Sequence, residues 1–291
     1  MTPAVTIGPP RNAAETATAW RLLTGEAGAN RPQTDSLFVA KTAAGGIVGA
    51  AVGILNEDGV LWVWPAVGPD ASARVKLLEA VCATGFGHGA RLAQTLLEDV
   101  TDDVRADLTA AAFRPIATIA FLERPPGPVD AVPGPGIAGT FRVGRDEGRL
   151  ERLVAETYRD SRDCESLGEA RSAADAIRGH RQVGRFDPSW WSIYTVDGDD
   201  AGVLLASPMG AGGDENRDVG LEITYVGVAP PSRRTGLASQ MLADAVARSE
   251  THRLGTIRVA VDTVNTPAFA LYHRFGFASV GAREAFVRDR R

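Results

Sequence analysis

Apolar side chains recur along this chain at two spacings, and segments of the two kinds follow one another. Residues 36–67 form apolar runs interrupted by turn residues at 44–46 and 56–59, a pattern typical of successive strands. Residues 73–89 place apolar side chains three and four positions apart, which predicts a helix. Residues 91–99 then fit a strand or a mixed segment, residues 102–113 predict a short helix, and residues 115–124 predict a final strand.

The second half of the chain repeats this order of elements. Residues 147–161 predict a helix, 190–208 a hairpin and 221–228 a strand. Residues 236–250 predict a helix with one apolar stripe. The remaining segments, 255–263, 266–275 and 278–289, predict a strand, a short helix and a last strand. The repetition indicates an internal duplication of a mixed α/β unit.

The two halves are separated by a segment rich in proline and glycine, from Glu123 to Gly139. Neither residue type suits the interior of a helix or of a central strand. We therefore expect an N-terminal domain of residues 1–124, a linker of residues 125–138 and a C-terminal domain of residues 139–291.

The composition narrows the classes of function. A chain of 291 residues, 44% of them hydrophobic and 23% charged, can bury the cores of two medium domains. Its net charge of −5 argues against a nucleic-acid partner, because such binding depends on neutralising phosphates. No secretory signal pattern or long apolar run is present, so we expect a cytoplasmic protein without a membrane partner. Cys82 and Cys164 fit no metal-ligand spacing, and we expect neither a disulfide nor a bound metal.

The stretch VGVAPPSRRTGLAS, residues 226–239, joins a predicted strand to a predicted helix. Two prolines end the strand, and Gly236 permits a backbone geometry or a close approach that other residues would prevent. The free N–H groups of the helix start, together with Arg233 and Arg234, would form a site suited to phosphate. By itself, the elbow is explained equally well as an ordinary turn with solvated arginines.

A second motif decides between these interpretations. The elbow pattern Arg233-x-x-Gly236-x-Ala238 is followed by the pattern Asn-x-x-Ala-x-x-x-Tyr-x-x-x-Gly-Phe, formed by Asn265, Ala268, Tyr272, Gly276 and Phe277. In this order the two motifs resemble the GCN5-related N-acetyltransferase (GNAT) family. The resemblance covers about residues 140–288, and the first half shares only the layout. It implies two tandem GNAT-like domains, each a mixed twisted sheet flanked by helices.

This resemblance implies that the anion is the pyrophosphate of acetyl-coenzyme A. The strand would leave its neighbour at a bulge, so that its main chain pairs with the pantetheine arm. Asn265 would bind the cofactor near the thioester, or cap the helix that begins at residue 266, or do both. The implied cofactor-binding residues are Val226, Gly227, Val228, Arg233, Arg234, Thr235, Gly236, Leu237, Ala238, Ser239 and Asn265.

The family transfers acetyl directly to a neutral amine. An amine with a pKa of about 10 is protonated at neutral pH, so a base is needed, and an acid assists the departing thiolate. The resemblance makes Tyr272 the acid, with a buried structural tyrosine as the alternative. Glu222 is the candidate base, with an exposed strand carboxylate as the alternative. Strand alternation would place it on the face of Thr224 and Val226.

The acceptor pocket of the family draws on the segment after the first helix. Tyr158, Ser161, Asp163 and Cys164 are the candidate contacts there. We expect Cys164 to line or pack the pocket rather than to act as a nucleophile, because no histidine is paired with it in the sequence pattern.

The first half lacks the chemistry of the second. Its elbow has no Arg-x-x-Gly-x-Ala pattern, and by alignment Leu61 stands opposite Glu222 and Leu108 opposite Tyr272. Aliphatic side chains cannot transfer protons. We therefore expect the N-terminal domain to be inactive and to serve in packing and in walling the acceptor cleft.

These observations together predict an acetyl-coenzyme A-dependent N-acetyltransferase that acts on a primary amine of a small molecule. We expect it to be a monomer or a weak homodimer. The alternatives are a non-catalytic module that senses acyl-coenzyme A and an enzyme that acetylates peptides or proteins. Retention of both Glu222 and Tyr272 argues against the sensor.

Overall fold

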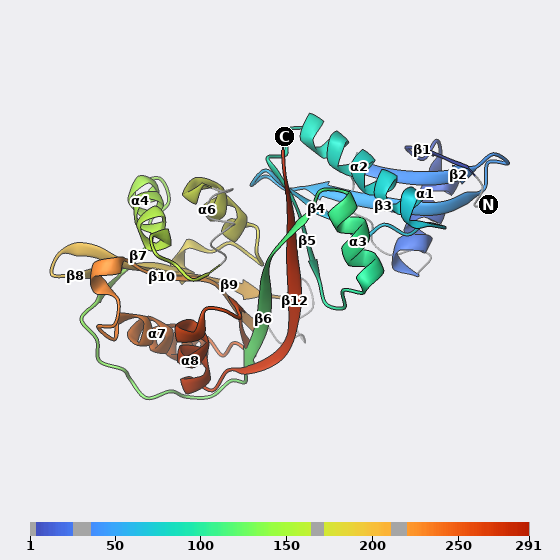
Figure 1. The fold of residues 1–291 in the computed structure, drawn as a ribbon. Helices are drawn as coiled ribbons and strands as arrows, with labels where there is room; N and C mark the ends of the chain where they lie inside the picture. Colours follow the sequence, from blue (N-terminus) through green and yellow to red (C-terminus); the bar gives the residue numbers. More distant parts are fainter. Residues whose placement is uncertain (1–3, 26–35, 164–171, 211–219, 291) are drawn as a thin grey trace. The chain divides into compact units, whose positions relative to one another are not determined.

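The computed structural model describes residues 4–25, 36–163, 172–210 and 220–290 (Figure 1). The chain forms two compact units, one of residues 1–116 and 284–291 and the other of residues 117–283. In each unit, helices pack on both faces of a mixed β-sheet. The expected mixed α/β class is confirmed.

The sheet of the first unit has the strand order β1, β2, β3, β4, β5 and the C-terminal part of β12. Helices α1 and α2 pack on opposite faces, since Trp20 shares a buried cluster with Val39, and Leu77 shares another with Ala40. The elements are β1 (Val5–Gly8), α1 (Ala13–Thr24), β2 (Ser36–Thr42), β3 (Ile47–Leu55), β4 (Val60–Val63), α2 (Ala71–Gly87), β5 (Leu92–Leu97) and α3 (Asp102–Ala110).

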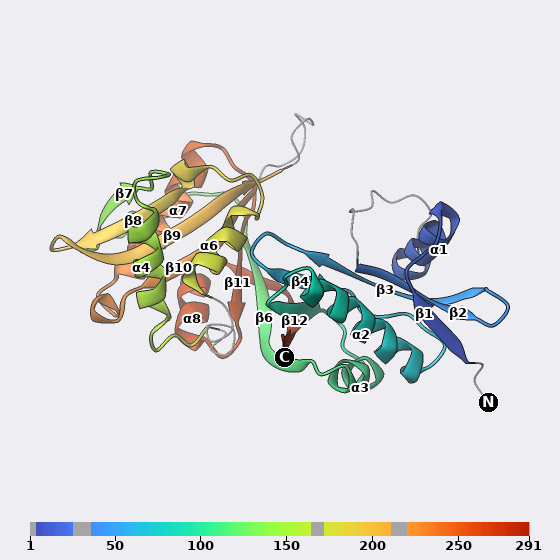
Figure 2. The same ribbon diagram turned by 90° about the horizontal axis from the view of Figure 1, so that it is seen from above.

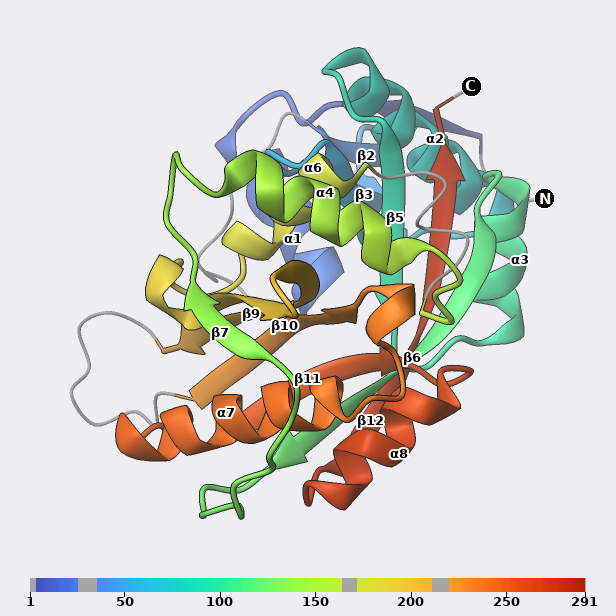
Figure 3. The same cartoon turned by 90° about the vertical axis from the view of Figure 1, so that its left-hand side faces the viewer.

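The sheet of the second unit has the order β12, β6, β11, β10, β9, β8 and β7. Helices α7 and α8 lie on one face of it and α4 and α6 on the other (Figures 1 and 3). Helix α4 lies next to α6 and across β9 and β10 (Figure 2). The elements are β7 (Ile137–Thr140), α4 (Glu147–Tyr158), α6 (Ala173–Arg181), η1 (Pro188–Trp190), β8 (Trp191–Val196), β9 (Asp199–Met209), β10 (Gly220–Val228), η2 (Pro230–Ser232), α7 (Leu237–Thr251), β11 (Ile257–Asp262) and α8 (Thr266–Arg274).

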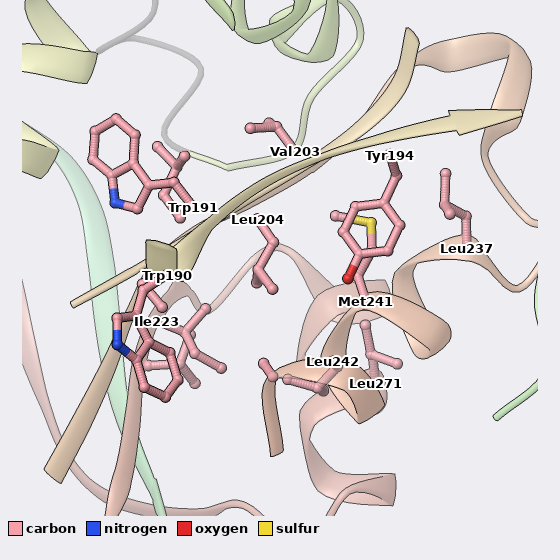
Figure 4. Packing of buried hydrophobic residues seen from close by; sticks show 14 of the residues in the cluster. Trp190, Trp191, Tyr194, Val203, Leu204, Ile223, Leu237, Met241, Leu242 and Leu271 are labelled. Atoms are coloured by element: carbon pink, nitrogen blue, oxygen red, sulfur yellow. The ribbon is translucent and has the colours of Figure 1, made fainter. Parts of the chain in front are cut away.

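The core of the second unit lies between its sheet and the helices. On the side of α7, Leu204 and Ile223 of the sheet face Met241 and Leu242 of the helix (Figure 4). The apolar stripe predicted for this helix is therefore the surface that packs against the sheet. Burying such side chains stabilises the unit by roughly 1.5–3 kcal/mol each. This packing fixes α7, and with it the elbow that precedes the helix.

Strands β6 (Arg114–Arg124) and β12 (Ala278–Asp289) each run from one unit into the other. Residues 119–124 of β6 pair with β11 in the second unit, although they precede the linker. Residues 284–289 of β12 pair with β5 in the first unit. The two halves of the sequence, before and after the linker, therefore exchange strands. The division into units differs from the boundary expected at residues 125–138.

The expected linker contains neither helix nor strand from residue 125 to residue 136, but it packs along the second unit. The Gln240 side chain of α7 accepts a hydrogen bond from the Gly136 N–H (3.0 Å) and donates one to the Gly136 carbonyl (2.8 Å). A Cβ at Gly134 would lie 2.8 Å from the Cβ of Gln240, so this close approach requires glycine. The segment is thus a packed strap of the second unit.

None of the helices in the described part of the chain combines the length and the apolar character needed to cross a membrane.

Candidate active site

Strands β10 and β11 separate part-way along their length. They pair in parallel from Leu221 to Ile223, and beyond that point β10 pairs with β9 alone among the described residues. The register between β10 and β9 shifts between Ile223 and Tyr225, so Thr224 forms a β-bulge. The bulge implied by the family resemblance is present. The edge from Tyr225 to Val228 keeps main-chain groups with which another extended segment can pair.

Helix α7 begins beyond this open edge without a side-chain cap. Its N-cap is Gly236, whose φ of 92° is a left-handed conformation that other residues rarely adopt. A Cβ there would meet no atom within 4 Å, so the space before the helix is open. The Gln240 N–H donates to the Gly236 carbonyl (3.0 Å), while the N–H groups of Leu237, Ala238 and Ser239 find no acceptor among the described residues. Three N–H groups and the helix dipole therefore fit an anion such as a phosphate.

The two arginines of the elbow have different surroundings. Arg234 is exposed and has a positive φ of 64°, and Thr235 donates through its hydroxyl to the Ser232 carbonyl (2.8 Å). The Arg233 guanidinium instead donates to four main-chain carbonyls, those of Val228 (3.1 Å), Thr157 (3.1 Å), Arg159 (2.6 Å) and Asp160 (3.1 Å). The N–H of Arg233 is also engaged, by Pro230 (3.3 Å). This corrects the expectation that Arg233 donates to the anion, because its donors hold the end of α4 against the elbow.

Glu222 lies on the face of β10 that α4 covers. Its partner across the ladder is Ser207, whereas Ile223 pairs with Ala206 and Val226 with Leu204. Ala206 and Leu204 line a cavity with residues of α7, so Ile223 and Val226 face α7 and Glu222 faces the opposite side. The expectation that Glu222 shares a face with Val226 is therefore wrong. The bulge at Thr224 inserts one residue and reverses the alternation.

The environment of Glu222 suits a proton acceptor. The side chain is half-buried, and burial raises its pKa above the ordinary value for a glutamate. Arg258 lowers this pKa and Glu123 raises it again. Beside Glu222, the Ser207 side chain is fully buried, and its hydroxyl has no hydrogen-bond partner among the residues that the structure describes. The sequence did not identify Ser207, because nothing in the run GVLLASP shows that its hydroxyl would be buried without a hydrogen-bond partner in the described structure.

Tyr272 lies in α8 and is almost fully buried, at 6% exposure. Its ring contacts that of Phe277 edge-on, with 5.7 Å between the ring centroids. Its hydroxyl forms no hydrogen bond with the residues that the structure describes. Burial raises the pKa of this hydroxyl, and the nearby Asp163 carboxylate raises it further. The hydroxyl therefore keeps its proton at neutral pH and remains a hydrogen-bond donor.

Asp163 connects the segment after α4 with the end of β11. Its carboxylate accepts a hydrogen bond from the N–H of Asp262 (3.0 Å), and burial of this carboxyl raises its pKa although the residue as a whole is exposed. Asn265 interacts with the same carboxylate, and its own Oδ1 accepts from the N–H of Ala268 (3.4 Å) as the N-cap of α8. The capping alternative for Asn265 is thus observed.

Residues 153–277 contain the split strands, the elbow and Tyr272, and they match the model of the acetyltransferase (GNAT) family. This part of the chain is a GNAT domain. In sequence, the chain is 26% identical over 208 residues to a mycothiol acetyltransferase from Thermobispora bispora, a match that covers 69% of this chain and 66% of that protein.

Solved structures extend the likeness beyond the GNAT domain. A GCN5-related N-acetyltransferase from Sphaerobacter thermophilus has a TM-score of 0.63 at 17% identity, over 98% of this chain and 95% of that one. A tandem GNAT protein from the clavulanic acid biosynthesis pathway has a TM-score of 0.55 at 14% identity, over 98% of both chains. The whole chain therefore has the fold of a tandem GNAT protein, as the family resemblance implied, and the duplicated order of elements agrees with it.

The candidate acceptor residues of the GNAT domain lie near the end of α4. Tyr158 packs edge-on against Tyr225 at 5.9 Å, and Ser161 accepts a hydrogen bond from the Asp163 N–H (3.2 Å). Cys164 lies outside the described residues. The sequence analysis did not single out Tyr225 as a site residue, but its hydroxyl shares a 2.7 Å hydrogen bond with Thr157 of α4. A tyrosine directly after the bulge could have signalled this contact between strand and helix.

Among the described residues, no group of three or more His, Cys, Asp or Glu side chains could hold a metal ion. Burial raises the pKa of the Cys82 thiol to about 11, so this cysteine of the first unit remains a protonated, packed side chain.

Proposed function

We propose that this protein is an acetyl-coenzyme A-dependent N-acetyltransferase that acetylates a primary amine of a small molecule. The observation that carries the proposal is the open edge of β10 beside the uncapped start of α7. An extended arm can pair with the former while its phosphates meet the N–H groups of the latter. We propose Val226 and Val228 as the pairing residues and residues 234–239 as the phosphate loop.

Acetyl-coenzyme A supplies a thioester carbonyl that a neutral amine can attack. In the proposed reaction Glu222, directly or through water, accepts the proton that the amine loses as its nitrogen–carbon bond forms. As the carbon–sulfur bond breaks, the Tyr272 hydroxyl donates its proton to the departing sulfur. The raised pKa values of both groups support these roles, because Glu222 becomes a stronger base and Tyr272 stays protonated.

The acceptor is proposed to enter on the α4 side of the sheet, where Glu222 lies. Acidic Glu222 and Asp163 favour a cationic amine over an anionic acceptor. The relative from Thermobispora bispora is named for acetylation of mycothiol, so its acceptor is one compound to test.

A library of small amines and peptides, assayed by release of free thiol from acetyl-coenzyme A, tests the proposal. Turnover with small amines would support it, and turnover confined to peptides would favour a protein acetyltransferase. Tight binding of acetyl-coenzyme A in calorimetry without turnover on any acceptor would instead favour the sensing module.

A further inference from the structure

Four polar residues form a row across adjacent strands of the second unit. Ser207 of β9 pairs with Glu222 of β10, Glu222 with Arg258 of β11, and Arg258 with Glu123 of β6. Residues directly opposite one another in a sheet project from the same face. The row therefore runs along the face on which the proposed base lies, from a buried hydroxyl to an exposed ion pair.

Arg258 is the cation of this row and lies opposite Glu222, yet its ion pair is with Glu123. Its Nε lies 2.7 Å from the Glu123 carboxylate, and the two side chains are 44% and 35% exposed. Within the described residues, Glu222 forms no ion pair. The guanidinium nevertheless reaches β10, because a Cβ at Gly220, two residues before Glu222, would lie 3.3 Å from Arg258 Nη1.

Glu123 comes from the part of the sequence that precedes the linker, on the strand that pairs with β11. We propose that Glu123 is a positioning residue for the base: by engaging Arg258, it keeps this guanidinium from pairing with Glu222. The strand supplied by the first half of the chain thereby takes part in the chemistry of the second. The effect of Glu123 on catalysis rests on the proposed function, whereas its effect on the pKa of Glu222 does not.

The charges around Glu222 support this assignment. Among the described residues, the ionised groups that act on its carboxyl are Arg258, which lowers its pKa, and Glu123, which raises it. On the other side of Glu222, Ser207 of β9 is uncharged. On α6, the His180 ring packs against Tyr225, with 5.5 Å between the ring centroids. A free Arg258 would stabilise the ionised form of Glu222 and so make it a weaker base.

Two substitutions with opposite expected effects test the proposal. Glu123→Gln releases Arg258 to Glu222 and should lower the pKa of Glu222, whereas Arg258→Gln removes the cation and should raise it. The measurement is an NMR titration of the full-length protein labelled with carbon-13 at glutamate carboxyls, with the Glu222 signal assigned by its loss in Glu222→Gln. Asp200→Asn, which breaks the ion pair of Asp200 with Arg149, is the matched control and should leave the Glu222 titration unchanged.

Kinetics provide the second readout. Glu123→Gln should lower kcat/KM for the amine by about two- to fivefold at pH values where Glu222 is ionised, the range for a partly exposed ion pair. Its KM for acetyl-coenzyme A should not change. Shifts of the same sign in the two variants, or no shift in either, would overturn the proposal. Opposite shifts together with full activity of Glu222→Gln would preserve the electrostatic coupling and refute Glu222 as the base.

Discussion

The two units share an architecture and differ at the positions where chemistry is proposed. In the first unit β4 and β5 pair in parallel over residues 60–62, and in the second β10 and β11 pair over residues 221–223. The middle residue of the three is Leu61 in one unit and Glu222 in the other. The seventh residue of the nine-residue helix that follows is Leu108 in α3 and Tyr272 in α8. Both leucines are buried in the core.

The first turns of the equivalent helices α2 and α7 also differ, and again only the second unit is open to a ligand. The N-cap of α2 is Asp70, whose carboxylate accepts a hydrogen bond from the Ala73 N–H (2.8 Å). The N-cap of α7 is Gly236, which leaves the first N–H groups to an external anion. A carboxylate at a helix start both occupies those donors and repels phosphate. The residue at the N-cap therefore decides the difference: Asp70 caps α2, whereas Gly236 leaves the start of α7 open to a ligand.

The largest effect is expected at the position of the proposed base. Glu222→Gln should lower turnover by about a hundred- to ten-thousand-fold while acetyl-coenzyme A still binds. Activity should partly recover toward high pH, because more of the amine is then neutral without help from the enzyme. The measurement is kcat/KM from about pH 6 to pH 10. Leu61→Met in the first unit is the control, and an equal loss there would break the contrast between the units.

Tyr272→Phe should reduce turnover by about a hundredfold, near the lower limit for a general acid. Since burial and Asp163 raise the pKa of Tyr272, the wild-type hydroxyl stays protonated across the range in which the amine becomes neutral. The defect should therefore persist at high pH, unlike that of Glu222→Gln. The same pH series measures it, with Leu108→Met as the control. Parallel profiles of the two active-site variants would contradict this division of roles.

Gly236→Glu should weaken binding of acetyl-coenzyme A by at least about tenfold relative to Gly236→Ala. The alanine variant carries the strain of a side chain at positive φ, so the difference between the two isolates bulk and charge. Calorimetry measures both affinities. Asp70→Asn in the first unit should leave the affinity unchanged. A matching change at Asp70 would mean that the first unit also binds the cofactor.

The smallest effect is expected at the two arginines. Arg234→Gln should weaken acetyl-coenzyme A binding by about two- to fivefold, and added salt should abolish the difference. Arg233→Gln should instead lower the melting temperature, because it loses hydrogen bonds to carbonyls at the end of α4 and just after it, each contributing about 0.5–1.5 kcal/mol. Calorimetry at two salt concentrations and thermal melting separate the two. A salt-sensitive loss of affinity without destabilisation in Arg233→Gln would restore it as an anion donor.

The sequence predicted what depends on neighbouring residues. The elements from β10 to α8 and the glycine at the start of α7 follow from patterns within a few positions. The bulge was expected only because the family resemblance implies it. Helix α1 was missed, although Asn12 accepts from the N–H of Glu15 as a cap and the Glu15 carboxylate accepts from Arg11, a local signal that could have been read.

Other features could not be predicted because they depend on distant parts of the chain. The carbonyls of Thr157, Arg159 and Asp160 that accept from Arg233 lie more than 70 residues earlier in the sequence. The face of Glu222 depends on a single inserted residue, since alternation after a bulge starts anew. The pairing of Glu123 with Arg258 required the knowledge that β6 lies beside β11.

The exchanged strands determine how the polypeptide would respond to proteolysis. A cut between residues 125 and 136 would produce two fragments, and each would carry a strand that the sheet of the other requires. The nicked enzyme should keep its main-chain ladders and travel as one particle. Expressed alone, a C-terminal fragment would expose the edge of β11 and lack Glu123 beside its proposed base, so its activity should return only on complementation with the N-terminal fragment.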